Sequence, residues 1–349
     1  MIRTGPEQLN RVFDSPMPNL DGASVLITGG TGSFGRAFAK SMLKRFKPSR
    51  LIIFSRDELK QHEMQSDPVF AERDYMRFFI GDVRDQNRLE SAMREVDYVI
   101  HAAALKQVPT AEYNPFECIH TNVLGAENVV QAAIRTGVRK VVALSTDKAA
   151  NPINLYGASK LASDKIFVAG NNMAGRVGTR FSVVRYGNVL GSRGSVVPLF
   201  RRLLAEGVRE LPITDERMTR FWITLDHGVN FVLSSLAMMV GGEIFVPKIP
   251  STDLTVLVRA MAPDAAFKTI GIRPGEKLHE IMISEDDART TVEFDDRYAI
   301  KPAYQWWDGQ PKGDIGGTPV PEGFTYTSDR QIETLSVEQM RNLLEIAKV

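Results

Sequence analysis

A glycine-rich loop directly after a short apolar run is the feature that most constrains the fold. The β-branched run Ser24–Thr28 predicts a buried strand, and helical spacing of apolar residues begins at Arg36. Between them stands Gly29-Gly30-Thr31-Gly32-Ser33-Phe34-Gly35. Glycines at 29, 32 and 35 allow a tight turn, close approach of backbone N–H groups to a pyrophosphate, and close helix–strand packing. The order strand, loop, helix predicts dinucleotide binding, and the alternative is a tight βα turn without a ligand.

Strand and helix patterns alternate through the first half of the chain. Further strands are predicted at 51–54, 78–80, 96–100, 140–144 and 181–185, and helices at 36–46, 86–95, 122–136 and 156–170. This alternation predicts an α/β fold with a Rossmann-type, doubly wound parallel sheet and helices on both faces. From about Gly187, Pro and Gly become frequent, which predicts a smaller C-terminal substrate-binding domain over the carboxyl ends of the strands.

These patterns suggest domain boundaries. We expect residues 1–21 to form an N-terminal extension and residues 22–186 to form an NADP-binding Rossmann domain. About 224–246 should return to that domain through a helix at 226–239. Residues 187–223 and 247–349 form the predicted substrate-binding domain. Its tail holds Trp306-Trp307, a Gly/Pro-rich stretch at 309–323, and a helix that Ser336 and Gln339 open as a capping box.

Composition excludes several classes of protein. A net charge of +1 in 349 residues gives no nucleic-acid footprint and no membrane-surface patch. A single cysteine, Cys118, excludes a disulfide framework. Residues 1–21 lack the apolar region of a secretory signal, and the apolar stretch 231–240 is too short to span a bilayer. The five histidines lack metal-ligand spacing. We therefore expect a soluble, cytoplasmic protein without a metal.

The end of the second predicted strand bears on the choice of cofactor. An acidic residue about 20 positions after the glycine loop would hold the ribose 2′-OH of NAD. This chain has Ser55-Arg56 there, which suits a 2′-phosphate, so NADP is favoured; Asp57 keeps NAD open as the less favoured cofactor. Alternatively, Arg56 is a solvated surface charge. The other predicted cofactor contacts are Lys60, Asp82, Val83, Ala102, Ala103, Ala104, Lys106, Tyr156 and Lys160, although the alanines could simply pack.

The segment from Ser145 to Lys160 carries the chemistry. Tyr156 and Lys160, four residues apart, share one helix face, where the ammonium can lower the phenol pKa so that the phenolate accepts a proton from an alcohol. Asp147-Lys148 would supply a second acid and base. A simple dehydrogenase does not need this pair, so the pattern favours elimination built on an oxidation. The alternatives are an amphipathic helix face and a surface ion pair.

With these residues the chain resembles the extended short-chain dehydrogenase/reductase superfamily and, more specifically, the soluble inverting UDP-N-acetylglucosamine 4,6-dehydratases. The resemblance covers about Ser24 to Glu280, with a weaker echo at 327–329. It is carried by His101–Ala104, Tyr156-xxx-Lys160 and the stretches 54–58, 104–109, 111–115, 145–149, 185–189, 191–198, 214–215, 217–221 and 272–280. Thr146-Asp147-Lys148 is the discriminating motif, since relatives that do not invert C5 usually have Asp-Glu there.

The resemblance implies a reaction in three stages. Tyr156 removes the C4 hydroxyl proton as NADP⁺ takes the hydride, while Lys160 lowers the tyrosine pKa and binds the nicotinamide ribose, and Thr146 hydrogen-bonds the C4 oxygen. Lys148 then acts as base at C5, for which its pKa must fall, and Asp147 acts as acid at O6. Hydride returns to C6 and a proton reaches the opposite face of C5. The product is UDP-2-acetamido-2,6-dideoxy-β-L-arabino-hexos-4-ulose, and the tightly bound cofactor is recycled.

The resemblance also implies a UDP-sugar site. Arg220 and Arg273 match diphosphate-binding arginines, and Glu276 would hold a uridine ribose hydroxyl or orient an arginine. The full predicted set is Lys106, Asn188, Arg193, Val196, Thr214, Met218, Arg220, Arg273 and Glu276. The charged and polar members could instead be structural. A homo-oligomer, either a dimer or a hexamer, and a role in pseudaminic-acid synthesis are further implications.

Several alternatives stay open at this stage. The chain could be a nucleotide-sugar dehydratase with another substrate, a 4-epimerase of the same superfamily, or a net reductase. Lys148 argues against an epimerase, which has no need of a base at C5. A non-catalytic NADP-sensing protein is the alternative from a different class, and such proteins typically lose the Tyr or Lys of the pair. The sequence does not determine the glycan pathway, the oligomeric state or the role of residues 1–21.

Overall fold

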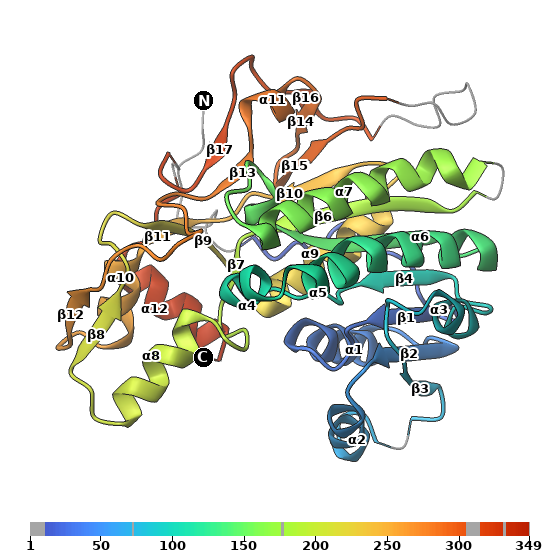
Figure 1. The fold of residues 1–349 in the computed structure, drawn as a ribbon, viewed down its shortest axis with the longest axis horizontal. Coiled ribbons are helices and arrows are strands. Elements are labelled where there is room, and N and C mark those ends of the chain that lie inside the picture. The colour runs from blue at the N-terminus through green and yellow to red at the C-terminus, as the bar shows by residue number, and fades with distance from the viewer. Residues whose placement is uncertain (1–10, 72, 176–177, 305–314, 331–332, 349) are drawn as a thin grey trace.

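A ten-stranded sheet forms the centre of the computed structural model, which describes residues 11–71, 73–175, 178–304, 315–330 and 333–348. Its strand order is β16-β14-β15-β10-β6-β5-β4-β1-β2-β3 (Figure 1). The strands are β1 (Ser24–Thr28), β2 (Arg50–Ser55), β3 (Met76–Ile80), β4 (Tyr98–His101), β5 (Lys140–Thr146), β6 (Arg180–Tyr186), β10 (Ile244–Pro247), β14 (Thr291–Glu293), β15 (Arg297–Ile300) and β16 (Thr318–Pro319). From β3 to β10 all pairs are parallel. The order β3-β2-β1-β4-β5-β6 confirms the doubly wound Rossmann-type sheet.

Helices cover both faces of this sheet. On one face α3 (Gln86–Ala92) contacts α6 (Gly125–Thr136), which contacts α7 (Leu155–Ala174). In Figure 1, α6 and α7 lie over the near face. On the other face α1 (Ser33–Arg45) contacts α9 (Leu225–Met238), which also packs on β5 and β6. Such two-sided covering explains why the parallel strands are almost continuous apolar runs.

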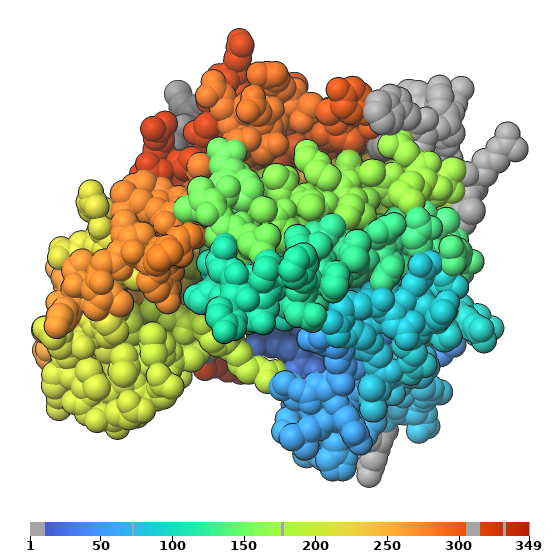
Figure 2. Space-filling model, in the orientation of Figure 1, coloured from blue at the N-terminus to red at the C-terminus, as the bar shows by residue number. Residues whose placement is uncertain are grey.

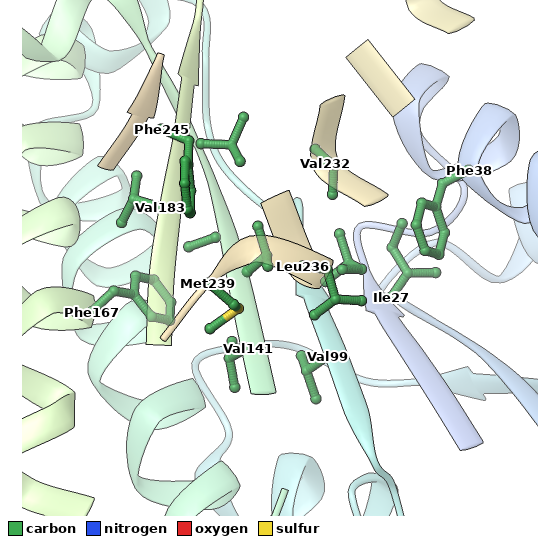
Figure 3. Packing of buried hydrophobic residues seen from close by; sticks show 14 of the residues in the cluster. Ile27, Phe38, Val99, Val141, Phe167, Val183, Val232, Leu236, Met239 and Phe245 are labelled. Carbon is green, nitrogen blue, oxygen red and sulfur yellow. The ribbon is translucent and has the colours of Figure 1, made fainter. Parts of the chain in front are cut away.

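The main core lies between α9 and the strands beneath it. Val99, Val141 and Val183 come from three adjacent strands, and Leu236 comes from α9, as Figure 3 shows. Each is at most 1% exposed. Burial of one such side chain contributes roughly 1.5–3 kcal/mol. This packing fixes the carboxyl ends of the strands, where the predicted site residues lie.

Most predicted elements are present with small shifts at their ends. The predicted helix 122–136 is the exception, because its first turn is a π-helix, η2 (His120–Leu124), that leads into α6. Within the described part of residues 22–186, three short α-helices were not predicted: α2 (Glu58–Ser66), α4 (Val108–Tyr113) and α5 (Pro115–Ile119). The predicted helix at 226–239 is α9, and the capping box of Ser336 and Gln339 opens α12 (Val337–Ile346).

A second apolar cluster holds the smaller lobe together, at the left of Figure 1 and in yellow in Figure 2. Its helices and strands are α8 (Val196–Ala205), β8 (Glu210–Ile213), α10 (Leu254–Met261), β12 (Ala266–Thr269) and α12. Two small sheets join it to the main body: β7 (Asn188–Val189) with β9 (Thr219–Ile223) and β11 (Ser251–Asp253), and β13 (Ile281–Ile283) with β17 (Tyr326–Thr327). The short helix α11 (Glu285–Ala288) follows β13.

The division of the chain is less simple than the predicted boundaries. β14, β15 and β16 lie within the predicted 247–349 segment, yet they extend the main sheet, because β15 pairs antiparallel with β10. The end of the predicted extension also packs on the main body, where Phe13 meets Phe231 of α9 at a ring distance of 5.0 Å. Trp306-Trp307 and residues 309–314 of the Gly/Pro-rich stretch lie outside the described residues.

Candidate active site

The glycine loop is built from backbone contacts that leave no room for side chains. Gly29 has a φ of +64°, and a Cβ there would lie 2.9 Å from the backbone N of Ala103. A Cβ on Gly35 would lie 2.4 Å from the carbonyl oxygen of Gly30. Since α1 begins at Ser33, its unpaired N–H groups and the positive end of its dipole face the loop. The arrangement is a cradle that fits a dinucleotide pyrophosphate.

Two cations flank the end of β2. Asp57 caps α2 by accepting the backbone N–H of Lys60 at 3.0 Å, and its carboxylate pairs with the Lys60 ammonium. These hydrogen bonds lower the pKa of Asp57. The guanidinium of Arg56 is half exposed and lies 3.5 Å from Asp82. Asp57 therefore caps its own helix and pairs with Lys60, while Arg56 pairs with Asp82, and all four side chains line the cavity beside Ser55.

The carboxyl end of β5 and the first turn of α7 bring the predicted catalytic residues together. Thr146 ends β5, and Asp147–Ala149 form a 3₁₀ turn, η3, that packs on α7. The Thr146 hydroxyl donates to Asp147 Oδ1 at 2.9 Å, and Lys148 Nζ lies 2.9 Å from the same oxygen. The side chain of Thr146 also acts on the Tyr156 phenol, whose pKa it lowers against the effect of burial. One carboxylate oxygen thus connects the threonine that contacts the phenol to the ammonium group.

Lys148, rather than Lys160, acts on the phenol of Tyr156. Burial raises the pKa of Tyr156 to about 12, and the charge of Lys148 and the hydrogen bond to Thr146 oppose the rise. Lys160 instead donates to the carbonyl oxygen of Leu144 at 2.7 Å, and burial lowers its own pKa. Tyr156 and Lys160 are four residues apart on α7, as predicted. The Lys160 ammonium, however, bonds the backbone at the end of β5.

The pKa of Lys148 moves in the direction opposite to the predicted one. Burial alone would lower it, but the carboxylates of Asp147 and Glu280 outweigh burial and raise it. Glu280 Oε1 lies 3.4 Å from Lys148 Nζ. A lowered pKa was predicted because Lys148 would be buried beside the cofactor and the substrate. In the structure two neighbouring carboxylates have the larger effect and raise the pKa. Lys148 is therefore an ammonium here.

A buried polar network supports the end of β5. Ser145 Oγ donates to Asp164 Oδ2 at 2.9 Å, and Arg185 lies 3.4 Å from the same oxygen. Burial raises the pKa of Asp164, although Arg185 and Lys160 oppose the shift. Arg185 also donates to the carbonyl oxygen of Met282 in β13, at 2.8 Å. The network ties the catalytic strand to the C-terminal segment.

A cavity of about 780 Å³ joins the glycine loop to the catalytic residues. Figure 2 shows the molecule hollowed between the yellow lobe and the blue N-terminal part. All the predicted cofactor residues line the cavity: Gly29, Thr31, Gly32, Ser33, Phe34, Gly35, Ser55, Arg56, Asp57, Lys60, Asp82, Val83, Ala102, Ala103, Ala104, Lys106, Tyr156 and Lys160. Thr146, Lys148, Asn188 and Arg193 also line it, whereas Asp147 is fully buried behind Lys148.

Arg193 lies on the cofactor side of this cavity. Its guanidinium donates to the carbonyl oxygen of Thr31 at 2.8 Å, and its backbone N–H lies 3.3 Å from Ser33 Oγ. Lys106 donates to the carbonyl oxygen of Arg193 at 3.0 Å, and burial lowers the pKa of Lys106. The loop that holds Arg193 is therefore closed onto the glycine loop, and the guanidinium meets backbone there rather than open space.

The other predicted substrate residues do not line the cavity. Thr214 and Met218 are buried in the smaller lobe, where Thr214 Oγ1 contacts Met218 Sδ. Arg220 is 7% exposed, and its guanidinium donates to the carbonyl oxygens of Thr219, Leu278 and Lys277. Val196 begins α8.

Arg273 and Glu276 pair with each other on a loop that approaches the site. Asn154, just before α7, donates to the carbonyl oxygen of Gly275 in this loop at 2.7 Å. The loop therefore sits beside Tyr156, although neither member of the pair lines the cavity.

The described ranges contain no cluster of His, Cys, Asp or Glu side chains that could hold a metal ion. Within the same ranges, no helix has the length and apolarity needed to span a bilayer.

The burial of His101 lowers its pKa to about 3, and Thr28 Oγ1 lies 2.9 Å from its Nδ1, so this histidine is a neutral core residue.

Known proteins match almost the whole chain. The family model for polysaccharide biosynthesis proteins matches residues 25–302. An inverting UDP-N-acetylglucosamine 4,6-dehydratase from Campylobacter jejuni is 58% identical over 329 residues, which cover 93% of this chain and 98% of the relative. Its counterpart from a second strain is 60% identical over 311 residues, or 88% of this chain and 92% of the relative. The chain belongs to the family of inverting UDP-N-acetylglucosamine 4,6-dehydratases.

Other relatives lie further away. The UDP-glucose 4-epimerase of Rickettsia canadensis is 46% identical over 288 residues, which cover 79% of this chain and 82% of that protein. Among solved structures, Pen from Bacillus thuringiensis has a TM-score of 0.86 at 34% identity and covers 94% of this chain and 98% of its own. The dTDP-glucose 4,6-dehydratase DesIV from Streptomyces venezuelae has a TM-score of 0.64 over 73% of this chain and 86% of its own. At 24% identity, DesIV shares the fold.

Several residues at the site were not predicted. Gln61 donates to Ser55 and to the carbonyl oxygen of Phe79, and so fixes the end of β2. Asn122 of η2 bonds both backbone groups of Leu105 in the loop after β4. The cavity is also lined by Phe54, Gly81, Gln107, Thr121, Leu144, Ser145, Tyr186, Gly187, Val189, Ser192, Gly194, Ser195 and Leu225. Gln61 and Asn122 act through contacts between elements that no local pattern displays.

Proposed function

We propose that this protein converts UDP-N-acetylglucosamine to UDP-2-acetamido-2,6-dideoxy-β-L-arabino-hexos-4-ulose, as a 4,6-dehydratase that inverts C5. The observation that carries the proposal is the Asp147–Lys148 ion pair, 2.9 Å long, with Lys148 on the wall of the cavity that also holds Tyr156. The high identity to inverting dehydratases supports the same assignment.

The glycine cradle fits a nicotinamide dinucleotide, and NADP is the proposed form. Arg56 and Lys60 supply positive charge beside Ser55, which suits a 2′-phosphate. Asp57, the residue that kept NAD open, is engaged as the cap of α2. When bound, the cofactor would accept the C4 hydride and return it to C6. Arg193, bonded to the glycine loop, would help to retain it between turnovers.

Tyr156 has the role of base in the first stage. It would accept the proton of the C4 hydroxyl, while Thr146 hydrogen-bonds the C4 oxygen. Because its pKa is about 12 in this structure, few phenol groups are ionised at neutral pH, and Lys148 provides the nearby positive charge that favours ionisation. Oxidation at C4 then acidifies the hydrogen at C5.

The ion pair holds one proton, which is all that the elimination requires. Transfer of that proton from the Lys148 ammonium to the Asp147 carboxylate gives a neutral amine and a carboxylic acid, and exclusion of water favours this neutral form. The amine then takes the C5 proton, and the acid donates its proton to O6 as the C–O bond breaks. Water leaves, and the ammonium–carboxylate pair is restored. A raised pKa for Lys148 before substrate binds is compatible with this sequence.

The second candidate function is that of a nucleotide-sugar 4-epimerase, because a UDP-glucose 4-epimerase from Rickettsia canadensis is 46% identical to this chain. A dehydratase for another nucleotide sugar and a net reductase are further alternatives, and a non-catalytic NADP-sensing protein is a distant one. Lys148 favours elimination over epimerisation, since rotation of a 4-keto sugar needs no base at C5.

Incubation of the purified protein with UDP-N-acetylglucosamine, without added cofactor, separates these alternatives. Mass spectrometry of the nucleotide sugar should show loss of one water. An unchanged mass with a new epimer would favour a 4-epimerase, and consumption of added NADPH would favour a reductase. UDP-N-acetylglucosamine could instead remain unchanged while UDP-glucose, a GDP-sugar or a dTDP-sugar loses water. That result would identify the protein as a dehydratase for the other nucleotide sugar.

We also propose that the protein acts in the cytoplasm as a homo-oligomer, either a dimer or a hexamer. Its product is a precursor for deoxyamino sugars of the pseudaminic-acid type. The proposed UDP-sugar contacts are Lys106, Asn188, Arg193, Val196, Thr214, Met218, Arg220, Arg273 and Glu276. For the residues that do not line the cavity, this role requires rearrangement when substrate binds.

A further inference from the structure

A buried carboxylate from the C-terminal half of the chain, that of Glu280, lies beside the Lys148 ammonium, which also pairs with Asp147. Glu280 directly precedes β13, which packs on the η3 turn that holds Asp147 and Lys148. Glu280 is 2% exposed, and its Oε1 lies 3.4 Å from Lys148 Nζ. The ammonium is therefore held between two carboxylates, one adjacent in sequence and one 132 positions away, from Lys148 to Glu280.

Glu280 is itself held firmly at the backbone. Its N–H donates to Ser328 Oγ at 2.8 Å, and its carbonyl oxygen accepts the N–H of Ser328 at 2.9 Å. Ser328 Oγ in turn lies 2.7 Å from Thr219 Oγ1. The carboxylate thus projects from a fixed point where two segments meet, and it can act as a rigid anchor for a flexible lysine side chain.

The charge of Glu280 is balanced, but its hydrogen bonding is incomplete. Arg220 Nε lies 3.7 Å from Glu280 Oε1, and the rest of the guanidinium is committed to three backbone carbonyls. Glu280 Oε2 has no hydrogen-bond partner among the residues that the structure describes. Buried carboxylate oxygens in purely structural positions are almost always bonded. Both carboxylates beside the Lys148 ammonium depart from this pattern, since Asp147 Oδ2 is also without a hydrogen-bond partner among the described residues.

Glu280 is the second carboxylate that can hold the Lys148 ammonium in place. The charged and titratable groups that face Lys148 are Asp147 on η3, Glu280, Arg220 from β9, Lys277 and Tyr156 on α7. Of these, Arg220 and Lys277 repel an ammonium, and Tyr156 is neutral. The Lys277 ammonium donates to the carbonyl oxygen of Ala150. Asp147 alone would leave the long side chain free to swing about one oxygen.

We propose that Glu280 is a positioning residue that fixes Lys148 Nζ at the cavity wall for removal of the C5 proton. The proposal rests on the elimination chemistry proposed above. Glu280 does not touch the sugar in this account; it acts through Lys148. Glu280 can affect the C4 chemistry only indirectly, through the charge that Lys148 supplies to the Tyr156 phenol, so elimination should respond more strongly than oxidation to its loss.

The test compares Glu280→Gln with wild type in a single turnover with UDP-N-acetylglucosamine. Gln keeps the volume of the side chain and removes its charge. We expect C4 oxidation to proceed, elimination to slow at least tenfold, and reduced cofactor to build up at 340 nm, with KM changed less than threefold. Glu280→Asp should recover part of the elimination rate. Glu243→Gln is the matched control, since Glu243 is equally buried but bonds Ser182 and the 240–241 turn.

A second readout does not depend on turnover. Glu280 contributes to the raised pKa of Lys148, so its removal should increase the free amine at Lys148 and hence labelling of that lysine by an amine reagent near pH 8.5, scored by peptide mass spectrometry. We expect labelling at least threefold faster in Glu280→Gln and unchanged in Glu243→Gln.

The outcomes separate the two proposals. If wild type forms no dehydrated sugar, the proposed function fails and the role of Glu280 in removal of the C5 proton fails with it; faster labelling would then show only that Glu280 stabilises the Lys148 ammonium. If wild type dehydrates but Glu280→Gln eliminates at the wild-type rate or faster, the positioning role is overturned. Equal slowing of both half-reactions, or unchanged labelling of Lys148, overturns it as well, because a merely structural residue would give those results.

Discussion

Lys148 illustrates at the residue scale how neighbouring charges decide what a side chain can do. The same ammonium pairs with Asp147, lies near Glu280, and opposes the rise that burial causes in the pKa of Tyr156. A single side chain thus connects the oxidation at C4 to the elimination at C5 and C6. Its removal should affect the two stages unequally.

Substitution Lys148→Ala should abolish dehydration, with a loss of at least about 10²-fold, because the base is gone. The cofactor should stay bound, and oxidation at C4 should slow, since the Tyr156 phenol loses its supporting charge. Rapid-mixing absorbance at 340 nm, with product analysis, measures both stages. Lys140→Ala at the opposite end of β5 is the control, and turnover by Lys148→Ala at the wild-type rate would contradict the assigned role.

The raised pKa of Tyr156 predicts how oxidation depends on pH. In the proposed mechanism the phenolate is the base, and with a pKa of about 12 its ionised fraction increases about tenfold for each pH unit below that value. The rate of reduced-cofactor formation should therefore rise with pH from about 7 to about 9. Tyr156→Phe should abolish this phase, whereas Tyr186→Phe, which alters another tyrosine of the cavity, should keep the rise. A rate independent of pH would contradict the account.

At the scale of elements, the turn between β1 and α1 sets the cofactor cradle. It works because the backbone of Gly35 lies against Gly30 with no Cβ between them. The short helix α2 adds a second device, since its cap Asp57, on the cavity wall, is engaged with the backbone N–H of Lys60. Both devices depend on backbone geometry, which a single side chain can disturb.

Gly35→Ala should lose bound cofactor and cost roughly 1–3 kcal/mol, because its Cβ would overlap Gly30 and push α1 away. Cofactor released on denaturation and the thermal midpoint measure the two effects. Gly228→Ala is the matched control: it lies in α9, an added Cβ meets nothing within 4 Å, and it should gain about 0.5–1 kcal/mol. Full cofactor content in Gly35→Ala would refute the cradle argument.

At the scale of the molecule, the sequence predicted the parts that local pattern controls. Apolar runs predicted β1 to β6 but not the later strands, and the glycine loop predicted the cradle at the start of α1. The contacts of Glu280, Gln61 and Asn122 could not be predicted, because each joins segments that only the fold brings together. For the same reason the sequence did not reveal that the guanidinium of Arg220, a predicted diphosphate ligand, is buried against three backbone carbonyls.

The direction of the Lys148 pKa shows the same limit. Burial beside a ligand was foreseeable, but the second carboxylate came from a distant segment. Residues 11–20 are a further case: Arg11 pairs with Glu333 at 2.6 Å and Phe13 packs on α9, so the segment joins the C-terminal part to the main body. Polar, proline-interrupted sequence gave no sign of either contact.

Proton NMR of the purified protein with UDP-N-acetylglucosamine in D₂O, without added cofactor, tests the central claim most directly. The account predicts a new C6 methyl signal, loss of the C5 proton signal through deuterium incorporation, and ring coupling constants of an L-arabino product. A product with the C5 configuration of the substrate, or a C5 proton retained from the substrate, would contradict the assignment of Lys148 and Asp147 to an inverting elimination.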